Sequence, residues 1–129
     1  MKVIGMIARY LLGVIFAFFG ANHLFSFLPK PAAMPTGPAG EFISAMTASG
    51  YFYVVGACEV VPGLLLLIGR FVPLGLVVLG AVIVNIDLTA ILFSRMALPM
   101  SAFVTVLWLL VFYQNRAAFA PLFKARAEG

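Results

Sequence analysis

The fold is decided by residues 51–69, which read YFYVVGACEVVPGLLLLIG. This stretch is apolar almost throughout, and Glu59 is its only strongly ionisable side chain. An α-helix needs about 20 mainly apolar residues to cross a bilayer. Three further runs of the same kind cover residues 3–27, 71–94 and 96–115. The sequence therefore predicts an all-α integral membrane protein with four spanning helices.

The overall composition also requires an apolar environment. Of the 129 residues, 64% are apolar and 9% are charged, whereas a soluble domain has about 45–50% apolar and about 25% charged residues. A chain this short has too much surface for its volume to bury so much apolar material. A soluble monomer and a disordered chain are therefore excluded, and lipid must cover the surface.

The charges and the cysteine content exclude further classes. The net charge of +4 comes from eight scattered basic residues that form no basic run, so nucleic acid is not an expected partner. The single cysteine, Cys58, allows neither an internal disulfide nor a CxxC redox pair. With His23 as the only histidine, haem held between two helices is not expected. The sequence also carries no metal or nucleotide motif.

The connections between the spans predict their arrangement. Residues 28–50 are rich in proline and form a predicted outer loop, with a short helix over 41–49. Gly69 and Pro73 mark a tight turn after the second span, and residues 94–99 form the next turn. Short turns make the joined helices antiparallel neighbours. We therefore expect a four-helix antiparallel bundle, a single membrane domain over residues 1–129 with a cytoplasmic tail over 116–129.

The distribution of lysine and arginine predicts the orientation. An even number of spans places both termini on one side, and cytoplasmic loops carry an excess of these residues. The side with the termini has six of them: Lys2, Arg9, Arg70, Arg116, Lys124 and Arg126. The opposite side has two, Lys30 and Arg95. The predicted topology is multi-pass, with both termini in the cytoplasm.

Polar side chains from three spans fall in the outer half of the predicted membrane: Asn22, His23, Glu59, Asn85 and Asp87. At a rise of about 1.5 Å per residue, Glu59 lies roughly 12 Å and Asp87 roughly 10 Å below the outer ends of their helices. A charged group at mid-membrane costs about 2.5–3.5 kcal/mol on insertion scales, so such residues normally face the bundle interior. These five are the candidate ligand-binding residues. A structural hydrogen-bonding role is also open, and no catalytic residue is singled out.

Helical spacing adds two expectations about packing. Asn85 and Asp87 are about 200° apart around their helix and face different neighbours, whereas residues 85 and 89 share a face. On the first span, Gly13, Ala17 and Ala21 recur every four residues. Such a stripe of small residues lets another backbone approach closely. We interpret it as a helix-packing surface.

Two stretches carry a recognisable family pattern. Residues 8–25, ARYLLGVIFAFFGANHLF, end in a Gly-x-x-basic-Leu/Phe element. Residues 56–71, GACEVVPGLLLLIGRF, contain a Gly-x-x-Glu-x-x-Pro-Gly element. Together these stretches resemble the DoxX/DoxD-like family of small membrane proteins, and the resemblance covers the first three spans.

The resemblance implies a four-helix bundle in the bacterial inner membrane. Family members are similar to, or associated with, membrane oxidoreductase systems. These include a quinone-linked thiosulfate oxidoreductase subunit and a complex that links membrane thiol homeostasis to superoxide defence. Related eukaryotic branches resemble assembly chaperones for membrane receptors. Membership alone therefore does not select one function.

The leading hypothesis is a subunit that supports membrane redox chemistry through a quinone, quinol or other small-ligand pocket at the five candidates. Such a chain would be at most a subunit of a membrane oxidoreductase and not catalytic alone. Its expected partners are the lipid bilayer, oxidoreductase subunits and further copies of the chain. The alternative is a non-catalytic assembly or interaction protein, in which the polar cluster is structural and the small-residue stripe binds a partner. A transporter ranks lowest, because the inner half has no polar route to the cytoplasm.

Overall fold

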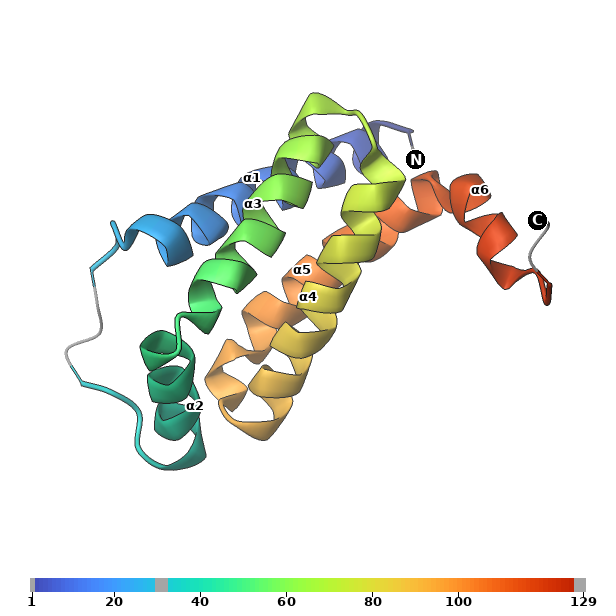
Figure 1. Ribbon diagram of the computed structural model, residues 1–129. Helices are drawn as coiled ribbons and strands as arrows, with labels where there is room; N and C mark the ends of the chain where they lie inside the picture. The colour runs from blue at the N-terminus through green and yellow to red at the C-terminus, as the bar shows by residue number, and fades with distance from the viewer. Residues whose placement is uncertain (1, 30–32, 127–129) are drawn as a thin grey trace.

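The computed structural model describes residues 2–29 and 33–126, and every regular element within these ranges is helical. The elements are α1 (Lys2–Phe25), α2 (Gly37–Ala48), α3 (Tyr51–Ile68), α4 (Val72–Leu92), η1 (Arg95–Ala97), α5 (Leu98–Gln114), α6 (Arg116–Phe119) and η2 (Ala120–Phe123) (Figure 1). Four of the helices are long and apolar enough to cross a membrane. The predicted all-α class and the membrane four-helix bundle are confirmed. The predicted loop at 30–32, including Lys30, and the tail at 127–129 lie outside the described residues.

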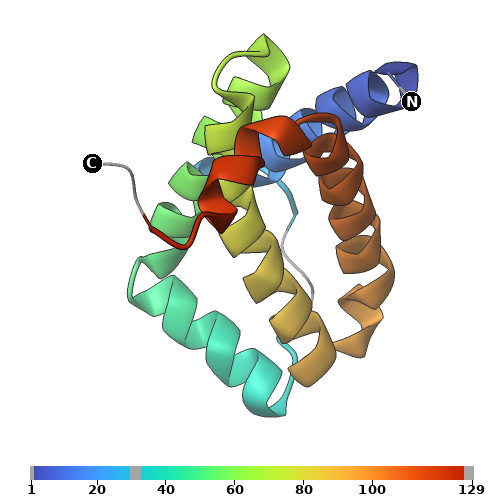
Figure 2. The ribbon, with the colours of Figure 1, turned by 90° about the vertical axis from the view of Figure 1, so that its right-hand side faces the viewer.

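The four long helices form a ring in which each packs against two antiparallel neighbours, in the order α1, α3, α4, α5 and back to α1 (Figures 1 and 2). The most extensive packing is between α1 and α3. We call the end of the bundle that holds the start of α1 and the turn between α3 and α4 the proximal end. The end of α5 lies there too, because Gln114 Nε2 donates to the Lys2 carbonyl oxygen at 3.3 Å. The opposite, distal end holds α2 and the turn between α4 and α5.

The proximal turn between α3 and α4 is formed by the predicted glycine and proline. Gly69 ends α3 with φ 80°, in the left-handed region that glycine adopts readily, and Pro73 lies in the first turn of α4. Arg9 of α1 donates from Nη1 to the Leu66 carbonyl oxygen at 2.7 Å. This carbonyl belongs to the last turn of α3, where backbone oxygens lack helical partners and a cation is favourable. Arg9 therefore ties α1 to the end of α3.

Several element boundaries differ from those predicted, and two of the differences have a clear local cause. The first helix ends at Phe25 instead of residue 27, because Ser26 has φ 51° and Asn22 Oδ1 accepts a hydrogen bond from Leu28 N at 2.9 Å. The helix in the predicted loop begins at Gly37 instead of residue 41. Pro38 lies in its first turn, where a proline costs no hydrogen bond. Pro38 therefore lies at the start of a helix, although the prolines of this segment were expected to form a loop.

Close contact between α1 and α3 depends on four glycines, Gly13, Gly20, Gly56 and Gly63, which we call the glycine seam. A methyl group on Gly63 would lie 2.8 Å from the Ala17 backbone nitrogen, and one on Gly20 would lie 2.8 Å from the Gly56 carbonyl oxygen. Two helices can approach this closely only where side chains are absent. The predicted stripe therefore packs a helix through Gly13 and Ala17, and the seam also includes Gly20, which the stripe did not contain.

The apolar core fills the proximal half of the bundle. Its fully buried side chains include Leu12 of α1, Leu66 of α3, Leu76 of α4 and Val111 of α5. Trp108 fastens α5 to α4 at this level, where its Nε1 donates to the Leu76 carbonyl oxygen at 2.9 Å. The distal half, in contrast, is not filled by the chain itself, and it contains the site described below.

Replacing Gly63 by valine tests the glycine seam. The new side chain would collide with main-chain atoms of α1, which cannot move aside as a flexible side chain can. We expect the free energy of unfolding to fall by about 1–3 kcal/mol. Denaturation in mixed micelles, followed by circular dichroism, measures the change. The matched control is Ala102→Val at an exposed position of α5, and an equal loss in the control would contradict this role of the seam.

Candidate functional site

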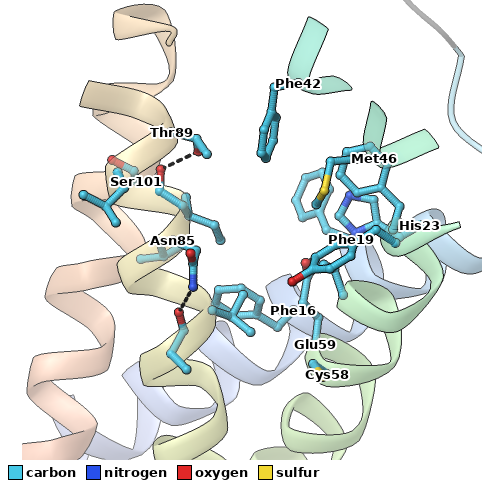
Figure 3. Close-up of a pocket in the computed structure, with 18 of the residues that line it drawn as sticks. Phe16, Phe19, His23, Phe42, Met46, Cys58, Glu59, Asn85, Thr89 and Ser101 are labelled. Carbon is cyan, nitrogen blue, oxygen red and sulfur yellow. Dashed lines mark hydrogen bonds and ion pairs between the residues drawn. The ribbon is translucent and has the colours of Figure 1, made fainter. Parts of the chain in front are cut away.

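A cavity of about 750 Å³ occupies the distal half of the bundle and is lined by residues of α1 to α5. Phe16 of α1 closes its floor, while Phe42 and Met46 of α2 lie at its mouth (Figure 3). Most of the lining is apolar, with polar groups on two facing walls. A concave, mainly apolar space of this size with a few convergent polar groups is typical of small-molecule sites.

The first wall, from α1 and α3, carries Glu59 and His23. Glu59 is buried, with 3% of the residue exposed. Its Oε1 lies 3.3 Å from His23 Nδ1, close enough for an ion pair when the imidazole is protonated. The ring is not oriented for a hydrogen bond, however, and Nδ1 is a buried atom without a hydrogen-bond partner among the described residues. Buried polar atoms normally have partners, so this pair is open to completion by a ligand.

The glycine seam places this pair. A methyl group on Gly20 would lie 2.8 Å from Cβ of Glu59, and one on Gly56 would lie 2.9 Å from Cβ of His23. Each of the two side chains therefore begins directly beside a glycine of the opposite helix. Phe52 stacks on the imidazole, with ring centroids 5.1 Å apart and planes 1° from parallel. The imidazole is thus held between the seam and an aromatic ring.

The second wall, from α4 and α5, carries an amide and two hydroxyl groups. Asn85 Nδ2 donates to the Ala81 carbonyl oxygen at 2.8 Å, and Thr89 Oγ1 donates to the Ile86 carbonyl oxygen at 2.9 Å (Figure 3). Ser101 Oγ donates to the carbonyl oxygen of Leu98 at 3.2 Å. Because these donors bond to their own helices, the side-chain oxygens of this wall are the groups best placed to accept from a ligand.

The structure brings three of the five sequence candidates to the cavity: His23, Glu59 and Asn85. Asp87 does not line it, and its Oδ2 instead accepts a hydrogen bond from Thr105 Oγ1 at 2.8 Å between α4 and α5. Asn22 is also absent from the lining and holds the turn after α1. The different faces expected for Asn85 and Asp87 account for this separation.

Several lining residues were not among the sequence candidates. Thr89 and Ser101 belong to the polar wall, and Phe42 and Met46 belong to the mouth. Thr89 lies four residues after Asn85 on the same helical face, and this spacing could have predicted that Thr89 lines the same wall as Asn85. No local pattern indicates that α2 folds over the bundle, because that contact depends on the course of the preceding segment.

The two walls present both donors and acceptors of hydrogen bonds to the apolar space between them. An imidazole beside a carboxyl group offers a donor and an acceptor on one wall, and the opposite wall offers amide and hydroxyl oxygens. Within the described residues, no group of three or more His, Cys, Asp or Glu side chains is placed to hold a metal ion.

Comparison with known proteins identifies the family. The family model described as DoxX matches residues 4–95, which cover α1 from its third residue and the whole of α2 to α4, and thus the Glu59–His23 pair and Asn85. The chain belongs to the DoxX family and is a multi-pass membrane protein. Neither curated proteins nor solved structures gave a significant match.

A Thr105→Val variant tests the structural role of Asp87. The substitution keeps the shape of the side chain but removes the donor to Asp87 Oδ2. We expect the free energy of unfolding to fall by about 1–3 kcal/mol, because a half-buried carboxylate loses its partner. Thr47→Val on exposed α2 is the control. A loss no larger than that of the control, in the same micelle denaturation assay, would show that the Asp87–Thr105 bond does not hold α5 on α4.

Proposed function

We propose that this DoxX-family protein binds a quinone or quinol in its distal cavity and supports membrane redox chemistry as a subunit. The observation that carries the proposal is the pairing of Glu59 and His23 across an apolar cavity from Asn85 and Thr89. In this account the chain supplies binding and proton exchange. The electrons come from a partner oxidoreductase subunit.

Quinone chemistry suits the two walls. A quinone is a neutral, planar ring with carbonyl oxygens that accept hydrogen bonds, and aromatic side chains favour stacking with such rings. His23 can donate to one carbonyl oxygen, while a quinol hydroxyl can donate to Asn85 Oδ1 or Thr89 Oγ1. Reduction of the ring takes up protons as well as electrons, and the cavity holds an acid and a base, Glu59 and His23, that can exchange them.

The topology that goes with this proposal places the cavity in the outer half of the bacterial inner membrane, with both termini in the cytoplasm. The support is the charge distribution, since the proximal end has more lysine and arginine than the distal end. A ligand would then exchange protons nearer to the outer face than to the cytoplasm.

The alternative, a non-catalytic assembly protein, loses part of its support. This alternative assigns the small-residue stripe as the surface that binds a partner. In the structure, Gly13 and Ala17 of this stripe pack against α3 of the same chain. The structural bonds of Asn22 and Asp87 fit this alternative, whereas the open Glu59–His23 pair does not. We therefore favour the ligand-binding function.

Quinone binding in nanodiscs tests the proposal. Trp108 is the only tryptophan, and it packs against Gly80, next to the cavity residues Ala81 and Val82. Saturable quenching of its fluorescence by a methylated benzoquinone therefore reports binding. We expect Glu59→Gln to weaken binding about tenfold or more, because the amide no longer supports a protonated His23 as the donor to a quinone carbonyl oxygen. Loss of one such charge-assisted hydrogen bond corresponds to about 1.4 kcal/mol.

The matched control is Asp87→Asn, which changes a membrane carboxylate that does not line the cavity. We expect its affinity for the quinone to match that of the unaltered protein. Equal weakening in both variants would indicate a general effect on the fold, and quenching that never saturates would indicate partition into lipid. Either result would contradict the proposed site.

A further inference from the structure

A second hollow of about 600 Å³ lies between α3 and α4. Its lining comes from residues 53–65 of α3 and from Leu74 and Val78 of α4, and the Tyr53 hydroxyl and the Cys58 thiol are its polar side-chain groups. Two of its lining residues, Val61 of α3 and Leu74 of α4, are 58% and 56% exposed. In a membrane this surface is in contact with lipid chains. We call this hollow the α3–α4 groove.

The groove and the cavity are continuous along one edge of α3. Val54 and Cys58 line both of them, and Glu59 follows Cys58 directly in the cavity wall. The cavity also reaches the surface on this side, because its lining residues Val54 of α3 and Leu88 of α4 are 61% and 49% exposed. A molecule whose polar part contacts Glu59 therefore has an apolar path outward past Cys58.

Two other directions are obstructed. Toward the proximal end, α3 and α4 converge on their turn (Figure 1), where a methyl group on Gly75 would lie 2.8 Å from Leu66 Cδ1. Toward the distal end, α2 covers the mouth, and the Phe42 ring lies 5.4 Å from that of Phe93 of α4. A ligand too long for the cavity can therefore leave it sideways, between α3 and α4.

We propose that the ligand is an amphiphile whose headgroup occupies the cavity and whose single apolar chain lies in the α3–α4 groove. This inference rests on the proposed function and deepens it, because it makes the chain a part of the ligand that the protein recognises. The groove suits an alkyl or isoprenoid chain, because its lining offers dispersion contacts and few hydrogen-bonding groups.

The size of the effect follows from the surroundings. The chain moves from lipid into a protein groove that is equally apolar, so there is little hydrophobic driving force and the gain comes from packing. We therefore expect a chain to tighten binding by about tenfold and not by several orders of magnitude.

The experiment compares two probes in nanodiscs, a methylated benzoquinone without a side chain and the same ring with a decyl chain. Their affinities are measured by equilibrium dialysis of the labelled probes, because the variants introduce a second tryptophan and fluorescence quenching would no longer report on Trp108 alone. Val61→Trp fills the groove from an exposed position that does not line the cavity. We expect this variant to lose about tenfold in affinity for the decyl probe and to keep its affinity for the chainless probe. Val106→Trp, at a 54% exposed position of α5 away from both hollows, is the matched control and should change neither affinity.

Photo-crosslinking gives an independent readout that needs no variant. A decyl probe with a diazirine near the end of its chain should label residues 57–65 of α3 and 74–78 of α4. Labelling mainly of α1 or α5, or equal affinity of the unaltered protein for both probes, would overturn the inference. So would a change of oligomeric state in Val61→Trp by light scattering, because the groove would then be covered by a second copy of the chain.

These outcomes separate the inference from the function on which it rests. If Glu59→Gln weakens the chainless probe while Val61→Trp changes neither probe, the headgroup site stands and the groove is overturned. If Glu59→Gln leaves the chainless probe unaffected, the proposed function itself fails.

Discussion

The close backbone contact between α1 and α3 is the constraint on which the rest of the structure depends. Four glycines allow the two helices to approach until any added methyl group would meet main-chain atoms or the base of a side chain. The same contact places Cβ of His23 beside Gly56 and Cβ of Glu59 beside Gly20. The seam that joins the two helices therefore also positions an imidazole and a carboxyl group at the cavity.

The bundle is filled unevenly along its length. Leucine and valine side chains from all four long helices close the proximal half, and Trp108 and Arg9 fasten helices together there with bonds to carbonyl oxygens. These contacts hold the four helices together at the proximal end, while the cavity occupies the distal half. Burying the Glu59 carboxyl group within the membrane costs free energy. No hydrogen bond within the described residues offsets this cost at Glu59. Asp87 shows the contrast, since a threonine hydroxyl partners it between two helices.

Local pattern was enough to predict much of this molecule. Four apolar runs predicted the spanning helices, and the angle between Asn85 and Asp87 predicted that they would face different neighbours. The pairing of His23 with Glu59 could not be predicted, because it depends on the register of α1 against α3. Gly20 and Gly56 lie against each other at this register, and the predicted stripe of small residues did not include Gly20. The position of α2 over the cavity was also inaccessible, since it arises from contacts distant in sequence such as Phe42 with Phe93.

Infrared difference spectroscopy on quinone binding tests most directly the claim that the Glu59–His23 pair receives the ligand. The carboxyl stretching region reports a change in protonation or hydrogen bonding at a single acid when isotope labelling and substitution identify the band. The account predicts a ligand-induced carboxyl band that disappears in Glu59→Gln and persists in Asp87→Asn. A band that persists in Glu59→Gln, or that disappears in Asp87→Asn alone, would contradict it.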